Sequence, residues 1–101
     1  MSQVSVIAKI PAAPGKRPEL IAALQAALDN AAGEEGTLEY ILHEDTNDAD
    51  AVWFYERYTD GAALQAHSTS DAFKAIGASL APLMGGRPEL TILKPIGGKG
   101  L

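Results

Sequence analysis

The sequence predicts an α+β domain of the ferredoxin-like β-α-β-β-α-β plan, with helices packed on one face of a four-stranded antiparallel sheet. Four short segments alternate apolar and polar residues with the period of a strand, and the segments after the first and third strands carry apolar residues at helical spacing. A chain of 101 residues is most simply one domain. We expect that domain to span residues 1–95 and residues 96–101 to form a flexible tail.

The four predicted strands cover residues 4–10, 37–44, 51–59 and 89–94. The first, VSVIAKI, has one wholly apolar face, and the third, AVWFYERYT, is the richest in β-branched and aromatic residues. The segment DTNDADA between the second and third strands is dense in turn residues and predicts a hairpin.

The first predicted helix starts near Pro18, because proline is tolerated in a first helical turn where its missing N–H is not needed. From Glu19 onward, leucine and alanine recur at spacings of three and four residues, as in an amphipathic helix. We expect Gly33 and Gly36 to end this helix.

A broken helical region is predicted between the third and fourth strands. Asp60 can cap a short helix that runs through His67, and Ser70 can cap a second helix that runs to about Met84. Pro82 is expected to kink or shorten that second helix, since proline removes one backbone hydrogen bond.

Composition excludes several classes of function. A net charge of −5 without a basic run argues against nucleic-acid binding, and the absence of cysteine excludes disulfides and thiolate chemistry. The sequence carries neither a secretory signal pattern nor an apolar stretch of 18 residues, so we expect a cytoplasmic protein with no membrane contact. The two histidines, His43 and His67, are predicted on opposite faces of the sheet, which argues against a metal site.

One face of the predicted sheet has no helix to cover it, although it is apolar. Its large side chains are Ile7, Ile41, Trp53, Tyr55 and Leu93. An exposed apolar patch of this kind usually marks an interface, so we expect a homodimer joined through the open sheet face. Arg57, on the same face, is expected to form an ion pair between subunits.

A carboxylate interrupts the apolar row on the other face. Strand parity places Glu56 toward the helices, where an unpaired carboxylate is costly. His67 lies three residues after Leu64 and therefore shares its inward helical face. We expect a closed pocket in which Glu56 and His67 form a direct or one-water hydrogen bond, with the hydroxyls of Tyr40 and Tyr58 nearby.

His67 and Glu56 could instead have purely structural roles. A lone histidine on an apolar helix face is often a hydrogen-bonded packing residue. Glu56 could instead anchor a helix N-terminus, such as the backbone amides that follow Ser70.

Three stretches of the chain resemble the antibiotic biosynthesis monooxygenase (ABM) domain family, which includes candidate quinol monooxygenases. They are IAKIPAAPGKRPEL, TLEYILHED and FYERYTDGAALQAHSTSDAF, and the resemblance covers roughly residues 3–95. It implies a dimeric α+β barrel with a pocket between the sheet and the helices of each subunit. Some members of the family oxidise aromatic polyketides or quinols with O₂ and no metal or flavin, whereas others degrade haem.

The haem-degrading branch fits this sequence poorly. Relatives of that branch carry an iron-ligating histidine where this chain has Gly77 and a tryptophan where it has His67. They also carry an asparagine in the first strand, where this chain offers Ser5, Ile7 or Ala8. The axial ligand is what holds haem iron, so we expect no haem, and no cofactor of any kind.

The residues and the resemblance together predict a cofactor-independent monooxygenase that oxidises a small aromatic, phenolic or quinol substrate with O₂. We expect His67 to act as the catalytic base and Glu56 to position it, because oxygenation of a quinol begins with removal of a proton. The expected substrate-binding side chains are Tyr40, Phe54, Tyr58 and Phe73. The alternative is a non-catalytic dimeric module that binds a small ligand or serves a partner enzyme on the same barrel.

Overall fold

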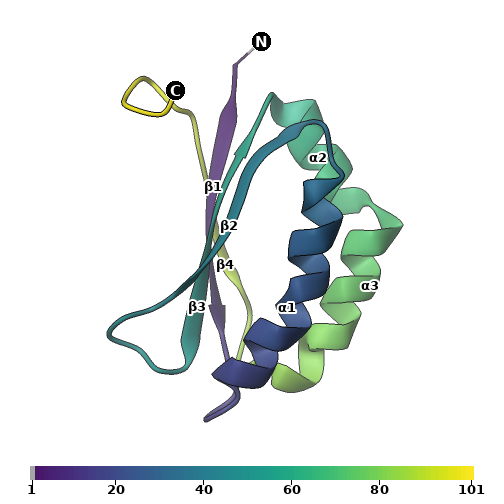
Figure 1. Ribbon diagram of the computed structural model, residues 1–101, viewed down its shortest axis with the longest axis vertical. Coiled ribbons are helices and arrows are strands. Elements are labelled where there is room, and N and C mark those ends of the chain that lie inside the picture. Colours follow the sequence, from purple (N-terminus) through teal and green to yellow (C-terminus); the bar gives the residue numbers. More distant parts are fainter. Residues whose placement is uncertain (1) are drawn as a thin grey trace.

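The computed structural model describes residues 2–101 and has the predicted order of elements. The elements are β1 (Val4–Pro11), α1 (Arg17–Ala32), β2 (Thr37–Glu44), β3 (Ala51–Tyr58), α2 (Gly61–Thr69), α3 (Asp71–Leu80), a 3₁₀ turn η1 (Ala81–Leu83) and β4 (Glu89–Leu93). The strands form one antiparallel sheet in the order β2-β3-β1-β4. All three α-helices lie on the same side of this sheet (Figure 1). The ferredoxin-like α+β class is therefore confirmed.

The predicted capping residues start the two helices between β3 and β4. The Asp60 carboxylate accepts a hydrogen bond from the Ala63 N–H at 2.8 Å, and the Ser70 hydroxyl accepts one from the Phe73 N–H at 3.1 Å. Each cap satisfies a backbone donor that the first helical turn leaves free. The chain therefore breaks at Ser70, and α2 and α3 approach the sheet as separate helices.

The third helix is shorter than predicted. α3 ends at Leu80, and the next three residues form η1 instead of continuing to Met84. Pro82 lies inside η1 and has no N–H to give to a helical carbonyl, which accounts for the early end.

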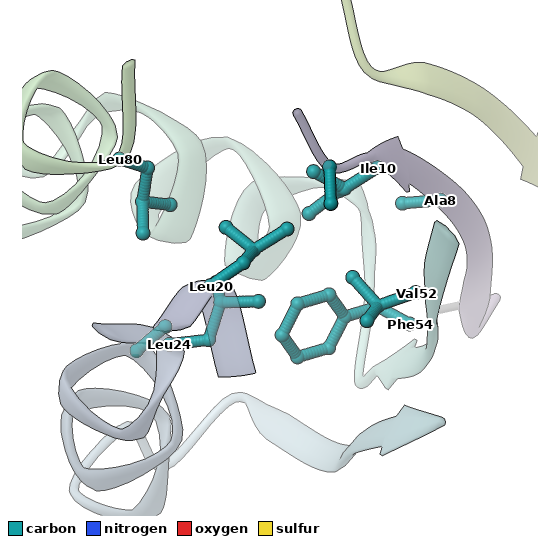
Figure 2. Close-up of a cluster of buried hydrophobic side chains, with 9 residues drawn as sticks. Ala8, Ile10, Leu20, Leu24, Val52, Phe54 and Leu80 are labelled. Atoms are coloured by element: carbon teal, nitrogen blue, oxygen red, sulfur yellow. The ribbon is translucent and has the colours of Figure 1, made fainter. Parts of the chain in front are cut away.

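The apolar core lies between α1 and the middle of the sheet. Leu20 and Leu24 of α1 pack toward Val52 and Phe54 of β3, and all four side chains are almost completely buried (Figure 2). Burying a leucine or phenylalanine side chain stabilises a fold by about 1.5–3 kcal/mol. Leu80 adds the contribution of α3 to the same cluster.

The helices leave the edge strand β4 uncovered. Leu90 and Ile92 pair with Ala8 and Val6 of β1 and share their helix-facing side, as strand parity predicts. Nevertheless Leu90 is 60% exposed and Ile92 is 65% exposed, because β4 makes its main contacts with β1 alone. Leu90 and Ile92 therefore face the predicted side of the sheet. The expectation that helices cover these two side chains is wrong.

A local irregularity displaces one further residue from its predicted face. Alternation with Tyr40 and Leu42 would place Leu38 on the side of the helices, but Leu38 is exposed. The pairing of β2 with β3 shifts between Thr37 and Glu39, and such a bulge disrupts the alternation of side chains.

The opposite sheet face is open, as predicted. Ile7, Ile41 and Leu93 are each more than a third exposed, and no helix lies on that side of the sheet (Figure 1). Arg57 lies on this face, but its Nε donates to Glu39 of the same chain at 2.7 Å. Strand β2 therefore supplies a carboxylate to Arg57 within the chain, and the ion pair between subunits stays a prediction. Within residues 2–101, no helix is long and apolar enough to cross a membrane.

Candidate active site

A pocket of about 560 Å³ lies between the sheet and the helices, and both α1 and α3 contribute to its wall. Most of its wall is apolar, with Ala8, Phe54 and Leu90 on the sheet side and Phe73 and Ile76 on α3. The polar side chains that border it are Tyr40, Glu56, Ser68 and Arg87. A largely apolar cavity with a few polar groups is typical of a small-molecule site.

Four of the six predicted site residues border this pocket, and two lie behind its wall. Tyr40, Phe54, Glu56 and Phe73 belong to the lining. His67 and Tyr58 are buried outside the lining, so the prediction that His67 faces the cavity is wrong. The pocket lies between the sheet and the helices, where the site is predicted.

His67 is enclosed by aromatic rings. Its ring centroid lies 5.1 Å from that of Tyr40, 5.5 Å from that of Tyr58 and 5.0 Å from that of Phe73. Only 4% of the residue is exposed, which confirms the inward orientation inferred from Leu64.

The hydrogen-bond partner of His67 is Glu34. His67 Nδ1 lies 2.7 Å from Glu34 Oε1, whereas the direct bond predicted with Glu56 is not the one formed. Glu34 lies in the loop between α1 and β2, and its Oε1 also accepts a hydrogen bond from the Thr37 hydroxyl at 3.0 Å. Sequence reasoning missed Glu34 because a loop residue has no periodicity from which its orientation can be inferred.

A glycine allows that loop to approach α2. A Cβ on Gly36 would lie 2.5 Å from the Cβ of Ala63, closer than two carbon atoms can pack. The Gly36 carbonyl also accepts a hydrogen bond from the Thr59 N–H at 2.9 Å, which ties the loop to the end of β3. The loop therefore lies close against α2, and Glu34 reaches His67. Gly36 was the one sequence signal of this contact, since such a glycine can mark close backbone approach.

Glu56 accepts a hydrogen bond from the Tyr58 hydroxyl at 2.5 Å. The two residues are two apart on β3 and therefore point to the same side of the sheet. The alternative in which Glu56 anchors the helix after Ser70 is wrong, because the Ser70 hydroxyl itself caps that helix.

Burial dominates the electrostatics of this group of side chains. Burial raises the pKa of Glu56, and the Tyr58 hydrogen bond and the nearby His67 partly oppose that rise. Burial likewise raises the pKa values of Tyr40 and Tyr58, with the Glu56 carboxylate adding to both. Both phenols are therefore protonated at neutral pH, and the Tyr58 hydroxyl donates to Glu56.

The geometry supplies a proton acceptor and a hydrogen-bond donor on one pocket wall. Glu56 is a carboxylate held in an apolar setting, and the Tyr40 hydroxyl has no protein partner within residues 2–101. In the same described range, no three His, Asp or Glu side chains come together as metal ligands could. His43 is exposed near the β2–β3 turn and contacts only its own strand through the Ile41 carbonyl.

The family's sequence profile, described as antibiotic biosynthesis monooxygenase, matches residues 3–79. The chain belongs to this family. Among solved structures, the ABM chain is similar to a candidate antibiotic biosynthesis monooxygenase from Caulobacter crescentus, with 30% identity, a TM-score of 0.87, and coverage of 95% of this chain and 92% of that one. A protein from Mycobacterium tuberculosis has 28% identity and a TM-score of 0.87 over 98% of this chain and 100% of that one. A candidate antibiotic biosynthesis monooxygenase from Chloroflexus aurantiacus has 30% identity and a TM-score of 0.82 over 98% of each chain. No curated protein matches the sequence.

Proposed function

We propose that this ABM-family protein is a cofactor-independent monooxygenase that oxidises a small phenolic or quinol substrate with O₂. The observation that carries the proposal is a buried carboxylate, Glu56, beside a free phenol, Tyr40, on the wall of an otherwise apolar pocket. An apolar cavity of about 560 Å³ accommodates one or two fused aromatic rings. Family membership supports the reaction class.

The reaction balances without an external reductant. With 1,4-dihydroxynaphthalene as a representative substrate, one O₂ gives 2-hydroxy-1,4-naphthoquinone and one water. One oxygen atom forms a new C–O bond at the ring and the other leaves as water, while the substrate supplies all four electrons. Removal of a hydroxyl proton comes first, because the quinolate anion is the species that reduces O₂ readily.

The proposed roles follow from which groups reach the pocket. Glu56 accepts the hydroxyl proton, since it borders the cavity and burial raises its pKa, which makes its carboxylate a stronger base. Tyr40 donates a hydrogen bond to a substrate oxygen, and Phe54 and Phe73 flank the ring. His67 acts from behind the wall on the charge of Glu56. Gly77, which also borders the pocket, offers no side chain that could ligate haem iron.

Dioxygen uptake tests the proposal. The protein, incubated with a panel of hydroquinones and dihydroxynaphthalenes in the presence of a metal chelator, should consume O₂ faster than a heat-denatured sample, which controls for autoxidation. With ¹⁸O₂, the product should gain one labelled oxygen atom. Tight binding of the quinols without turnover would contradict this function and support the alternative, a non-catalytic ligand-binding module.

We also propose that the chain forms a homodimer through its open sheet face. The exposed Ile7, Ile41 and Leu93 form an apolar surface that a second copy would cover. Light scattering at micromolar concentration should give twice the mass of the chain, and Ile41→Lys should shift the protein toward a monomer. A wild-type protein that is monomeric at that concentration would contradict the dimer.

A further inference from the structure

We propose that Glu34 is a positioning residue at the outer end of a proton relay, Glu34–His67–Glu56, that carries the substrate proton from the pocket to solvent. The inference rests on the proposed function. Glu34 does not border the pocket and cannot touch the substrate. It would act through His67, to which it is hydrogen-bonded at 2.7 Å.

The outer group of the proposed relay is more exposed to solvent than the two inner groups. Glu56 and His67 are buried, whereas the Glu34 side chain is 23% exposed. A proton accepted by a buried carboxylate must leave before the next turnover, and an imidazole can receive a proton on one nitrogen while it releases another. Glu34 provides the solvent-accessible acceptor at the end of that path.

The inner step passes beside Tyr58. The Tyr58 hydroxyl donates to Glu56, while its ring lies against the His67 ring with centroids 5.5 Å apart. The positive charge of a protonated His67 favours the ionised form of Glu56, so the two groups are electrostatically coupled. The titratable groups around His67 are thus Glu34 on the loop, Tyr40 on β2, and Glu56 and Tyr58 on β3.

In the proposed sequence, the substrate O–H bond breaks and its proton passes to a Glu56 carboxylate oxygen. Glu56 then returns to the carboxylate as its proton passes through a bridging water to the free nitrogen of the His67 ring. His67 releases its Nδ1 proton to Glu34, which exchanges it with solvent. The relay moves a proton only and needs no oxidant of its own. It leaves Glu56 ready for the next substrate.

A purely structural role for Glu34 makes a different prediction. Glu34 Oε1 also accepts the Thr37 hydroxyl hydrogen bond, so the residue could serve only to hold the loop against α2. A glutamine retains both hydrogen bonds but cannot accept a proton at neutral pH. Glu34→Gln therefore separates proton transfer from loop anchoring.

The experiment measures O₂ uptake with 1,4-dihydroxynaphthalene for the wild type, Glu34→Gln and Glu34→Ala, with and without added formate. Glu35→Gln is the matched control, because Glu35 is the exposed neighbour in the same loop. Thermal unfolding of every variant accompanies the kinetics. Formate is a small carboxylate that can enter the space that the alanine variant leaves open.

The relay predicts that Glu34→Gln lowers kcat by roughly 10²-fold with an unchanged melting temperature, while Glu35→Gln matches the wild type. Formate should raise the rate of Glu34→Ala and leave that of Glu34→Gln unchanged. A wild-type rate in Glu34→Gln would overturn the relay and leave the proposed function intact. If the glutamine variant loses stability, the alanine variant decides: restoration by formate supports the relay, and no response overturns it. A wild-type protein that consumes no O₂ overturns the proposed function, and the relay with it.

Discussion

The two halves of strand β3 line the same inner face of the sheet but meet different neighbours. Val52 and Phe54 pack against the leucines of α1 in an apolar cluster, and Phe54 also borders the pocket (Figure 2). Glu56 and Tyr58, the next two inward positions, join a polar and aromatic group around His67. All four residues are at least nine-tenths buried.

The two halves of β3 contribute differently to the stability of the fold and to the chemistry of the site. Burial of apolar side chains stabilises the half of β3 under α1, whereas burial of a carboxylate in the other half costs free energy unless hydrogen bonds offset it. Natural proteins often retain such unfavourable groups where activity requires them. The apolar half should therefore govern stability, and the polar half should govern chemistry.

The largest expected effect comes from the polar half. Glu56→Gln should lower the rate of quinol oxidation by roughly 10²–10⁴, the usual contribution of a general base. Its free energy of unfolding at neutral pH should equal or exceed that of the wild type, because the variant no longer buries a charge. Oxygen uptake and urea denaturation check the two expectations. A large loss of stability with normal turnover would reverse the assignment of the two halves.

A substitution in the apolar half should lower the unfolding free energy and leave turnover unchanged. Leu20→Ala removes a fully buried side chain that does not border the pocket, and it should cost about 2–5 kcal/mol of unfolding free energy. Urea denaturation measures that loss, and turnover per folded molecule should stay close to the wild type. A rate that falls tenfold or more in samples shown to be folded would indicate that the two halves are coupled.

A smaller effect is expected at Tyr58, which belongs to the polar half but is packed like a core residue. Tyr58→Phe keeps the ring and removes the donor to Glu56, so it should cost about 1–3 kcal/mol, the usual penalty for leaving a buried polar group unpaired. The loss should shrink when the same change is made in Glu56→Met, which has no carboxyl acceptor for the Tyr58 hydroxyl, and a double-mutant cycle measures the difference. Additive losses would show that the hydroxyl contributes nothing through Glu56.

The smallest effect is a pH dependence of stability. The folded chain holds the pKa of Glu56 above its ordinary value near 4.5, so it binds more protons than the unfolded chain between the two values. The contribution of Glu56 to stability should be fully present below the ordinary pKa and be lost as pH rises through the folded one. Unfolding free energies across this window should fall more steeply in the wild type than in Glu56→Gln. Parallel curves for the two proteins would contradict the raised pKa.

The strands, the helix caps and the inward face of Glu56 were predictable because each depends on local periodicity or on a single capping side chain. Asp60 and Ser70 cap their helices as expected, and the positions of Val52, Phe54 and Glu56 follow from alternation alone. The inward face of His67 followed in the same way from helical spacing. These features need no knowledge of how the chain packs over long distances.

The partner of His67 was not predictable, because it is set by a contact across 33 residues of sequence. The loop that carries Glu34 reaches α2 only because Gly36 permits close packing. The residues of a loop have no periodic pattern from which their position could be predicted. The exposure of β4 was missed for a related reason. Strand parity gives the face of Leu90, but it cannot say how far the helices extend across the sheet.

The most direct test of the account is a crystal structure of the protein with a quinol, 1,4-dihydroxynaphthalene, bound in the absence of O₂. We predict that the quinol rings lie between Phe54 and Phe73. One hydroxyl oxygen should lie within hydrogen-bond distance of Glu56, and the Tyr40 hydroxyl should donate to an oxygen of the ligand. A quinol that occupies the pocket with its hydroxyls directed away from Glu56, or that binds elsewhere on the chain, would contradict the central claim.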